Sequence, residues 1–236
     1  DTYISQEQMS AARVREGKSP VRKTQNLVKQ EGHFLEEKRG DFDWINASFF
    51  VAIHVLAATG IFYSISVRFS WWNVALAVLW YLFSGLSITG GYHRLFAHKS
   101  YQCNTLLSWF YLLFGAAAVQ NSVVDWVSDH RRHHAHTDDD HDPYNIIKGF
   151  LWAHIGWVLF KRVRLDYSNV SDLLSNRLVR FQHRYYVLLA LFVGGIIPVT
   201  IGLLWGDPLG AFFWAVSLRL VAQYHATFSV NSIAHY

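Results

Sequence analysis

The sequence is poor in cysteine and in charged residues, and both shortages restrict what the protein can be. Cys103 is the only cysteine among 236 residues, which excludes an internal disulfide and any site built from several thiolates. A lone cysteine also fits chemistry that faces a reducing compartment. Charged residues make up 16% of the chain, whereas 52% are hydrophobic and 17% are aromatic. This composition departs from the soluble average toward that of membrane proteins.

Two further features are missing. The net charge is only +4, and the basic residues form no stripe interleaved with aromatics, so we exclude nucleic-acid binding. The first twenty residues lack the apolar core of a signal peptide, and the chain begins at Asp1 rather than Met. We therefore expect residues 1–43 to be a polar N-terminal segment and membrane insertion to depend on internal spans.

Long runs almost free of Asp, Glu, Lys and Arg fill much of the remaining chain. The expected transmembrane helices are 44–67, 69–92, 185–205 and 209–235. Each is long enough to cross a bilayer core of about 30 Å at 1.5 Å per residue. Only Arg68 separates the first two, which predicts a helical hairpin. The sequence thus predicts an all-α membrane protein whose four transmembrane helices form one domain, 44–236, with a cytoplasmic helical cap.

Another uncharged run, 101–124, could also cross the membrane. It would then place the histidines on its two sides roughly 30 Å apart, on opposite faces. We instead predict an interfacial or re-entrant helix over about 104–122, and a second interfacial helix over 149–160. Most Lys and Arg beyond the N-terminal segment fall between residues 93 and 184, so the positive-inside rule assigns the histidine side to the cytoplasm.

Three groups of potential metal ligands follow the ends of these spans. They are His93 with His98; His130, His133 and His134; and Asn231 with His235. The H-x-x-H-H spacing puts the second group on one helix face. His93 and His98 are five residues apart, about 140° on an α-helix, so they converge only if the helix ends or bends, which Gly90 and Gly91 favour.

Imidazole without thiolate suits iron or a similar first-row metal better than calcium or magnesium. Six nearby carboxylates could orient the imidazoles: Asp125, Asp129, Asp138, Asp139, Asp140 and Asp142. Six other histidines are interpreted as packing or surface groups: His54, His136, His141, His154, His183 and His225. An alternative for "HRRHHAH" is a surface zinc site or a basic loop that binds lipid headgroups.

Five stretches together resemble one protein family: "GGYHRLFAHKSYQ", "QNSVVDWVSDHRRHHAHTDDDHDPYN", "GFLWAHIGWVLFKR", "FQHRYY" and "NSIAHY". In order, spacing and content they are similar to the membrane-bound stearoyl-CoA-type Δ9 fatty acyl desaturases, from about residue 44 onward. The resemblance implies a cytoplasmic di-iron centre in a four-helix membrane domain, which uses O₂ to insert a cis double bond into an acyl chain.

The resemblance also implies roles for individual residues. The implied metal ligands are His93, His98, His130, His133, His134 and His235, with Asn231 holding an iron through water; no other catalytic residue is implied. A third H-x-x-H-H box is expected some tens of residues after His235, beyond Tyr236. We therefore expect this chain to be C-terminally incomplete, and two irons only in the full-length enzyme.

Substrate contacts are implied in the same way. Gln120, Trp126 and Thr227 would shape the bend of an acyl tunnel, and Tyr81 with Gly85 would close its far end. The thioester and coenzyme A would be contacted by Asn121, Trp152, Lys161 and Arg162. Acyl-lipid or acyl-carrier-protein substrates stay open, because the same cations suit anionic lipid.

Electrons would come from a separate donor such as cytochrome b5, ferredoxin or rubredoxin, since the sequence has no cysteine cluster or haem motif. The expected location is the endoplasmic reticulum in a eukaryote or the inner membrane in a bacterium. Two alternatives remain at this point. One is a fatty acyl or lipid hydroxylase on the same metal chemistry, and the other is a non-catalytic membrane protein that binds lipid or metal.

Overall fold

A computed structural model of the chain describes residues 41–137, 142–160 and 167–234, all within one compact unit, Arg39–Tyr236. Helices dominate these residues, and the β-structure described is an isolated antiparallel bridge between Phe42 and Phe160. The fold is thus helical, as the sequence predicts.

The first two apolar runs form long helices joined by a short turn. α3 spans Trp44–Ser66, and α4, Trp71–Leu86, continues into the π-helix η1, Ser87–Ala97. The Asp43 carboxylate begins α3 by accepting hydrogen bonds from the backbone N–H groups of Ile45 and Asn46, a stabilising N-cap. The helix of the second run therefore ends five residues later than predicted.

The middle of the chain forms short helices. In order they are α5 (Thr105–Ala117), α6 (Val123–Ala135), η2 (Ile146–Lys148), α7 (Phe150–His154), η3 (Gly156–Leu159), η4 (Ser168–Val170), α8 (Ser171–Ser175) and α9 (Arg177–Arg184). Two further helical stretches follow. The first comprises α10 (Tyr186–Leu191), η5 (Phe192–Ile196), α11 (Ile197–Gly202) and η6 (Leu203–Trp205), and the second α12 (Pro208–Ala211), η7 (Phe212–Leu218) and α13 (Arg219–Ser232).

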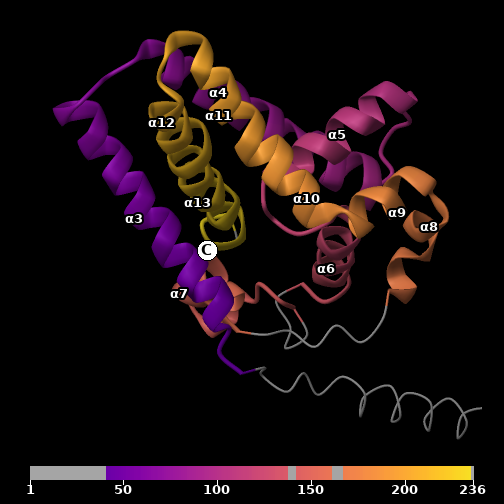
Figure 1. The fold of residues 1–236 in the computed structure, drawn as a ribbon. Coiled ribbons are helices and arrows are strands. Elements are labelled where there is room, and N and C mark those ends of the chain that lie inside the picture. The colour runs from indigo at the N-terminus through magenta and orange to yellow at the C-terminus, as the bar shows by residue number, and fades with distance from the viewer. Residues whose placement is uncertain (1–40, 138–141, 161–166, 235–236) are drawn as a thin grey trace, which may run out of the picture. The chain divides into compact units, whose positions relative to one another are not determined.

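Figure 1 shows α3, α4, α10–α11 and α12–α13 running side by side, with α6 and α7 at the end away from the turns that join them. At the turn end, buried Asp207 accepts hydrogen bonds from the Tyr63 hydroxyl and the Asn73 amide. At the other end, Asn46 donates to the Val158 carbonyl. The two ends of the bundle are thus fixed by contacts between distant segments.

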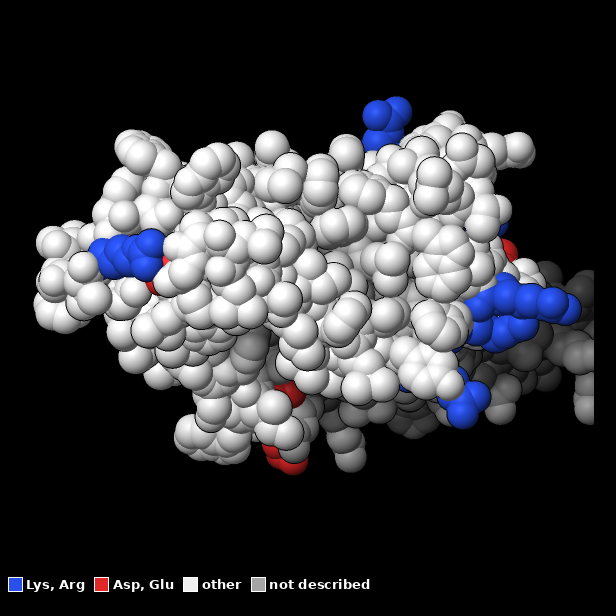
Figure 2. Space-filling view, turned by 45° about the horizontal axis from the view of Figure 1, so that its top comes forward, with Lys and Arg blue, Asp and Glu red and all other residues white. Residues whose placement is uncertain are grey.

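Within the described residues, three helices are long and apolar enough to cross a membrane: Trp44–Ser66, Trp71–Ala97 and Tyr186–Trp205. Their outward side chains are large and hydrophobic, with Leu204 84% exposed. Most of the face in Figure 2 carries no charged side chain. Exposed apolar surface on this scale requires a lipid environment, which marks the chain as a membrane protein. The fourth predicted span is helical over Pro208–Ser232 but is not among the three.

The two predicted interfacial helices have different outcomes. α5 has 13 residues, about 20 Å at 1.5 Å per residue, which is too short to cross a bilayer. It ends at Ala117, earlier than predicted. The helix predicted over 149–160 is wrong as a single element, because it breaks at Ile155 into α7 and η3. Gly156 lies at this break, where a Cβ would stand 3.2 Å from the Trp152 ring.

Glycine lets α5 pack closely against η1. A Cβ at Gly91 would lie 2.7 Å from Cβ of Tyr111, closer than packed carbon atoms approach, so the backbones meet only because Gly91 has no side chain. The fully buried Tyr92 connects further elements. Its hydroxyl accepts a hydrogen bond from Nε2 of Gln182, and Oε1 of Gln182 accepts one from the Val123 N–H. This network joins η1, α9 and the start of α6, the elements around the candidate site.

Candidate metal centre

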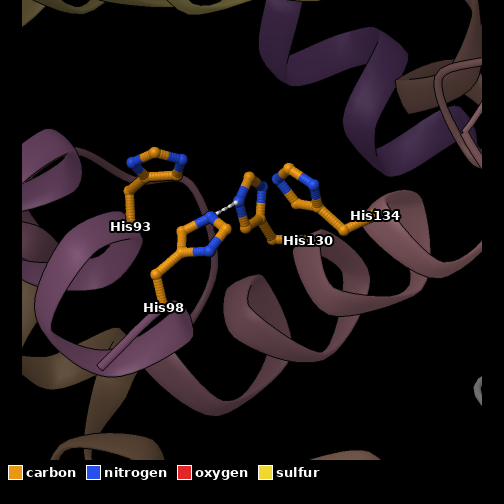
Figure 3. A group of neighbouring side chains, drawn as sticks. All are labelled: His93, His98, His130 and His134. Atoms are coloured by element: carbon orange, nitrogen blue, oxygen red, sulfur yellow. Dashed lines mark hydrogen bonds between the residues drawn. The ribbon is translucent and has the colours of Figure 1, made fainter. Parts of the chain in front are cut away.

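Four imidazoles from two helices converge at one point of the structure (Figure 3). His93 and His98 come from η1 and its C-cap, and His130 and His134 come from α6. One ligand nitrogen from each ring can be chosen so that all four lie within 4.8 Å of one another. These four predicted ligands therefore reach a common centre, although 32 residues separate His98 from His130.

The wide winding of η1 explains how His93 and His98 meet. The His98 N–H donates to the His93 carbonyl at 3.0 Å, an i→i+5 bond of the π-helical type. The ring centroids consequently lie 4.6 Å apart. The helix does end between them, at Ala97, as the sequence allowed. Gly90 and Gly91, which were expected to favour a bend, instead allow close packing against α5. The π-helical winding was not predicted. Such π segments are frequent at functional sites.

The donor set fits a first-row metal ion. The Nε2 atoms of His98 and His130 are 3.0 Å apart, and nitrogens bound to one ion at about 2.1 Å stand roughly 3.0–3.4 Å from each other. Imidazole is a preferred ligand of iron, zinc and copper, and the group contains no carboxylate or thiolate. Burial and the neighbouring imidazoles lower the pKa of His130 to about 3. The His130 ring is thus neutral at physiological pH, as metal binding requires.

His133 differs from the other predicted ligands on α6. Its ring is buried and its Nδ1 lies 2.9 Å from both carboxylate oxygens of Asp142. A carboxylate that contacts one ring nitrogen is the usual support of a histidine that binds metal through the other nitrogen. Asp142 is one of the six carboxylates predicted for this role. Asp125, by contrast, accepts from Tyr167 and Ser122.

An arginine that sequence reasoning missed holds the two histidine-bearing helices together. Arg131 donates to the backbone carbonyls of Phe96 and Ala97, at the C-terminal end of η1. It also forms a bidentate pair with Asp172, at 2.7 and 3.1 Å, and Asp172 binds Lys99 at 2.9 Å. A cation at a helix C-terminus satisfies the last carbonyls. Only the position of Arg131 beside His130 could have suggested this contact.

Of the residues predicted to shape the tunnel bend, Trp126 contacts this centre, and Gln120 and Thr227 contact each other. The Trp126 ring stacks on His130, with centroids 4.9 Å apart and an interplanar angle of 22°. The Gln120 amide donates to the Thr227 hydroxyl at 2.9 Å, which joins the α5–α6 loop to α13. Val119 and Asn121, on either side of Gln120, have φ of 55° and 76°. A positive φ is uncommon for a β-branched residue, and such strain concentrates at functional sites.

The other predicted substrate residues are distributed over several elements of the fold. Tyr81 and Gly85 are one turn apart on α4, and a Cβ at Gly85 would meet no atom within 4 Å. The backbone N–H of Asn121 donates to the Tyr186 hydroxyl. The indole N–H of Trp152 is buried without a hydrogen-bond partner among the described residues. Asn231 lies in the last turn of α13, whereas His235, Lys161 and Arg162 fall outside the described residues.

Comparison with known proteins identifies relatives of the whole region. Residues 69–236 match the family model described as fatty acid desaturase. The chain is 41% identical over 196 residues to a probable acyl-CoA desaturase of Schizosaccharomyces pombe, covering 82% of this chain and 40% of that protein. It is 38% identical to Delta(9)-fatty-acid desaturase fat-6 of Caenorhabditis elegans, covering 82% and 59%. Identity to the sn-1 stearoyl-lipid 9-desaturase of Anabaena variabilis is 35%, covering 82% and 69%. The chain therefore spans about half the length of the first two relatives.

Proposed function

Because the chain belongs to the fatty acid desaturase family, we propose that it is the metal-binding membrane part of an O₂-dependent fatty acyl desaturase. The reaction inserts a cis double bond, at Δ9, into a saturated acyl chain carried by coenzyme A. The four-imidazole cluster on η1 and α6, with Trp126 stacked on one of its rings, carries the proposal. The name of the Schizosaccharomyces pombe relative supports an acyl-CoA substrate. The name of the Anabaena relative leaves an acyl-lipid substrate as an alternative.

Iron is the proposed metal. His93, His98, His130 and His134 would hold one ion, because one nitrogen from each ring lies within 4.8 Å of the others and the nitrogens of His98 and His130 are 3.0 Å apart. His133 with Asp142 behind it, His235 and the water-mediated Asn231 would contribute to a second ion in the full-length protein. When bound, iron supplies with O₂ the oxidising chemistry that an unactivated CH₂ group requires.

The chain's own residues place the substrate and exclude water. Trp126 covers one side of His130 and so forms an apolar wall beside the cluster. The Gln120–Thr227 hydrogen bond fixes the α5–α6 loop against α13, and we assign this contact to the bend of the acyl tunnel. Tyr81 and Gly85 would end the tunnel, and Asn121, Trp152, Lys161 and Arg162 would contact the thioester and coenzyme A. Fixing which carbon meets the metal is the chief contribution of such a site.

The proposed topology keeps all ligands on one side of the membrane. Pro208–Ser232 is 25 residues of nearly continuous helix that carries one charge, Arg219. The Arg219 guanidinium is buried and donates to the carbonyls of Ala117 and Gly194, as intramembrane charges usually do. This helix can therefore serve as a fourth span. The histidine side, with the short helices as a cap, would face the cytoplasm of the endoplasmic reticulum or of a bacterial inner membrane, and residues 1–43 would precede the 44–236 membrane domain.

Desaturation removes two hydrogens from the acyl chain while O₂ is reduced to water, so electrons must come from outside. Cytochrome b5, ferredoxin or rubredoxin would supply them, since Cys103 alone can hold no iron–sulfur cluster. An acidic donor would suit the basic residues between 93 and 184.

Metal content and product together test the proposal. The full-length protein, purified from membranes, is expected to contain about two irons, and cells that express it should convert fed stearate into a cis monoene detected by mass spectrometry. His130→Ala should lose iron and product. His136→Ala is the matched control, because His136 follows the same helix but lies outside the four-imidazole group, and this variant should keep both.

The alternatives predict different products. An alcohol in place of the alkene would establish a hydroxylase on the same chemistry. Zinc, or no metal, with unchanged fatty acids would establish a lipid- or metal-binding protein. Retention of iron and activity by His130→Ala would contradict the assignment of the site.

A further inference from the structure

A shallow apolar groove runs along the outer surface of the third candidate span. It has a volume of about 470 Å³, and its lining residues are all apolar or aromatic, among them Phe181, Tyr185, Leu188, Phe192 and Ile196. Leu188 and Ile196 are more than half exposed. Because the groove continues from α9 along α10 and η5, its long axis follows the candidate span that begins at Tyr186. A groove of this lining and direction suits an acyl chain.

Two free cations stand at the membrane-surface end of this groove. Arg177 and Arg184 are exposed on α9 and form no ion pair or hydrogen bond within the described part of the chain. At 100° per residue they lie within about 60° of Phe181, which lines the groove. The Arg184 guanidinium lies 5.6 Å from the ring centroid of Tyr185, another lining residue. The positive charge and the groove thus share one helical face.

The opposite face of α9 is fixed. Val179 and Gln182 are fully buried, and Gln182 bonds both Tyr92 and the N–H of Val123. Arg180 is engaged with the last carbonyls of α8, at Leu174 and Ser175. These contacts fix the orientation of α9, so that Arg177 and Arg184 remain exposed just before Tyr186, where the candidate span begins.

We propose that Arg177, Arg184 and the groove from Phe181 to Ile196 form a binding site for one anionic phospholipid. The phosphate contacts the two guanidinium groups, which match its geometry, and one acyl chain occupies the groove. Neutral phospholipids share the apolar contacts but gain less from the two positive charges. This site is separate from the histidine cluster and does not depend on the proposed function.

The test titrates the full protein in detergent with phosphatidylglycerol and with phosphatidylcholine of identical acyl chains, and counts bound lipid by native mass spectrometry. One phosphatidylglycerol should bind at least about tenfold more tightly than phosphatidylcholine. Arg177→Gln with Arg184→Gln should abolish that preference, since each basic residue near an anionic headgroup contributes about fivefold. Leu188→Trp, which narrows the groove, should weaken both lipids alike.

Lys148→Gln is the matched control, because it removes an exposed charge that lies over Trp152 on another surface. It should leave the preference intact. Glycerol phosphate, which has no acyl chain, should not displace the lipid. Equal binding of the two phospholipids, an equal loss in Lys148→Gln, or displacement by glycerol phosphate would each overturn the proposal. Unfolding temperatures of all variants, expected to match that of the original protein, exclude a general loss of structure.

Discussion

At the scale of single residues, the support of a ligand matters as much as the ligand. His133 is held by both carboxylate oxygens of Asp142. We predict that Asp142→Asn lowers iron affinity about 10- to 100-fold, because the ring loses the charge that orients it and strengthens its basicity. Chelator competition measures the affinity, and Co²⁺ substitution reports the change in ligand field directly.

Asp125→Asn provides the control for that experiment. Asp125 lies on the same helix, but its carboxylate accepts from Tyr167 and Ser122 instead of a metal-binding histidine. Its substitution should leave the Co²⁺ spectrum unchanged. Equal losses of affinity in the two variants would mean that Asp142 acts on the fold in general and not on His133.

Asp172 gives a prediction that depends on pH. The bidentate bond from Arg131, helped by Lys99, lowers the pKa of Asp172 below its usual value. An aspartate whose pKa is lower in the folded than in the unfolded protein stabilises the fold at any pH above its unfolded-state pKa, about 3.9. This contribution is lost as the pH falls through the pKa of the folded state. Asp172→Asn should therefore destabilise by about 1 kcal/mol at neutral pH, as for a partly exposed ion-pair network.

The difference in unfolding free energy between the original protein and Asp172→Asn should stay constant from pH 7 to about 5 and shrink below about pH 4. Chemical denaturation in detergent across this range measures it. Asp41→Asn, at an exposed carboxylate, should show no such difference. A gap that widens toward acid would show that the ion pairs do not stabilise the fold.

The sequence identified candidate site residues better than it identified the contacts that those residues make. The four imidazoles that meet are among the six histidines predicted as ligands, but the sequence did not separate them from His133. The separate orientation of His133 could not be read from the spacing, because it depends on Asp142, nine residues away in an irregular segment. The contacts of Arg131 could not be predicted from the sequence either, since its partners are backbone carbonyls and an aspartate 41 residues away.

At the scale of elements, apolar runs located the long helices but not their local winding. α3 ends within one residue of its predicted bounds, because an uncharged run bounded by Asp43 and Arg68 leaves little freedom. The sequence carries no comparable signal for the π-helical winding of η1, which packs against α5 and α6, elements that follow it in the chain. The break at Ile155 was missed for the same reason: composition shows that a segment is apolar, not that it is continuous.

Three histidines, His54, His225 and His154, form a hydrogen-bonded chain of rings, called here the histidine ladder, that joins three elements. His54 donates from Nδ1 to the Phe50 carbonyl, which fixes Nε2 of a neutral His54 as an acceptor from His225. The other ring nitrogen of His225 then accepts from His154. α3, α13 and α7 are thereby linked through rings that sequence reasoning interpreted as packing groups.

We predict that His225→Phe destabilises the protein by about 1–3 kcal/mol, because it removes the partner of both other rings and leaves them unsatisfied. His54→Phe alone should lower the unfolding free energy by less, since His54 is the terminal ring of the ladder and its loss leaves the hydrogen bond between His225 and His154 in place. A double-mutant cycle of these two positions, followed by thermal unfolding, should give a coupling of about 0.5–3 kcal/mol. Additive effects would show that the ladder does not couple α3 to α13.

At the scale of the whole molecule, the topology rests on which segments share an end of the bundle. The loop holding Cys103 joins η1 to α5, so it belongs to the histidine end. Ser66 ends α3 beside Arg68, which bonds the Trp205 and Gly206 carbonyls at the opposite end. Our proposal that the histidine end faces the cytoplasm rests on the excess of Lys and Arg near the histidines. Because this chain has one cysteine, labelling of single-cysteine variants can show on which side of the membrane each position lies.

We predict that a membrane-impermeant maleimide added to sealed, right-side-out vesicles leaves Cys103 unlabelled until the membrane is permeabilised. In a Cys103→Ser background, Ser66→Cys should be labelled at once. Ala234→Cys, exposed just after α13, should behave like Cys103 if Pro208–Ser232 crosses the bilayer. Labelling of Ala234→Cys from outside would place the end of α13 on the side opposite Cys103. The two proposed groups of ligands would then be separated by roughly 30 Å of hydrocarbon, and they could not share one metal centre.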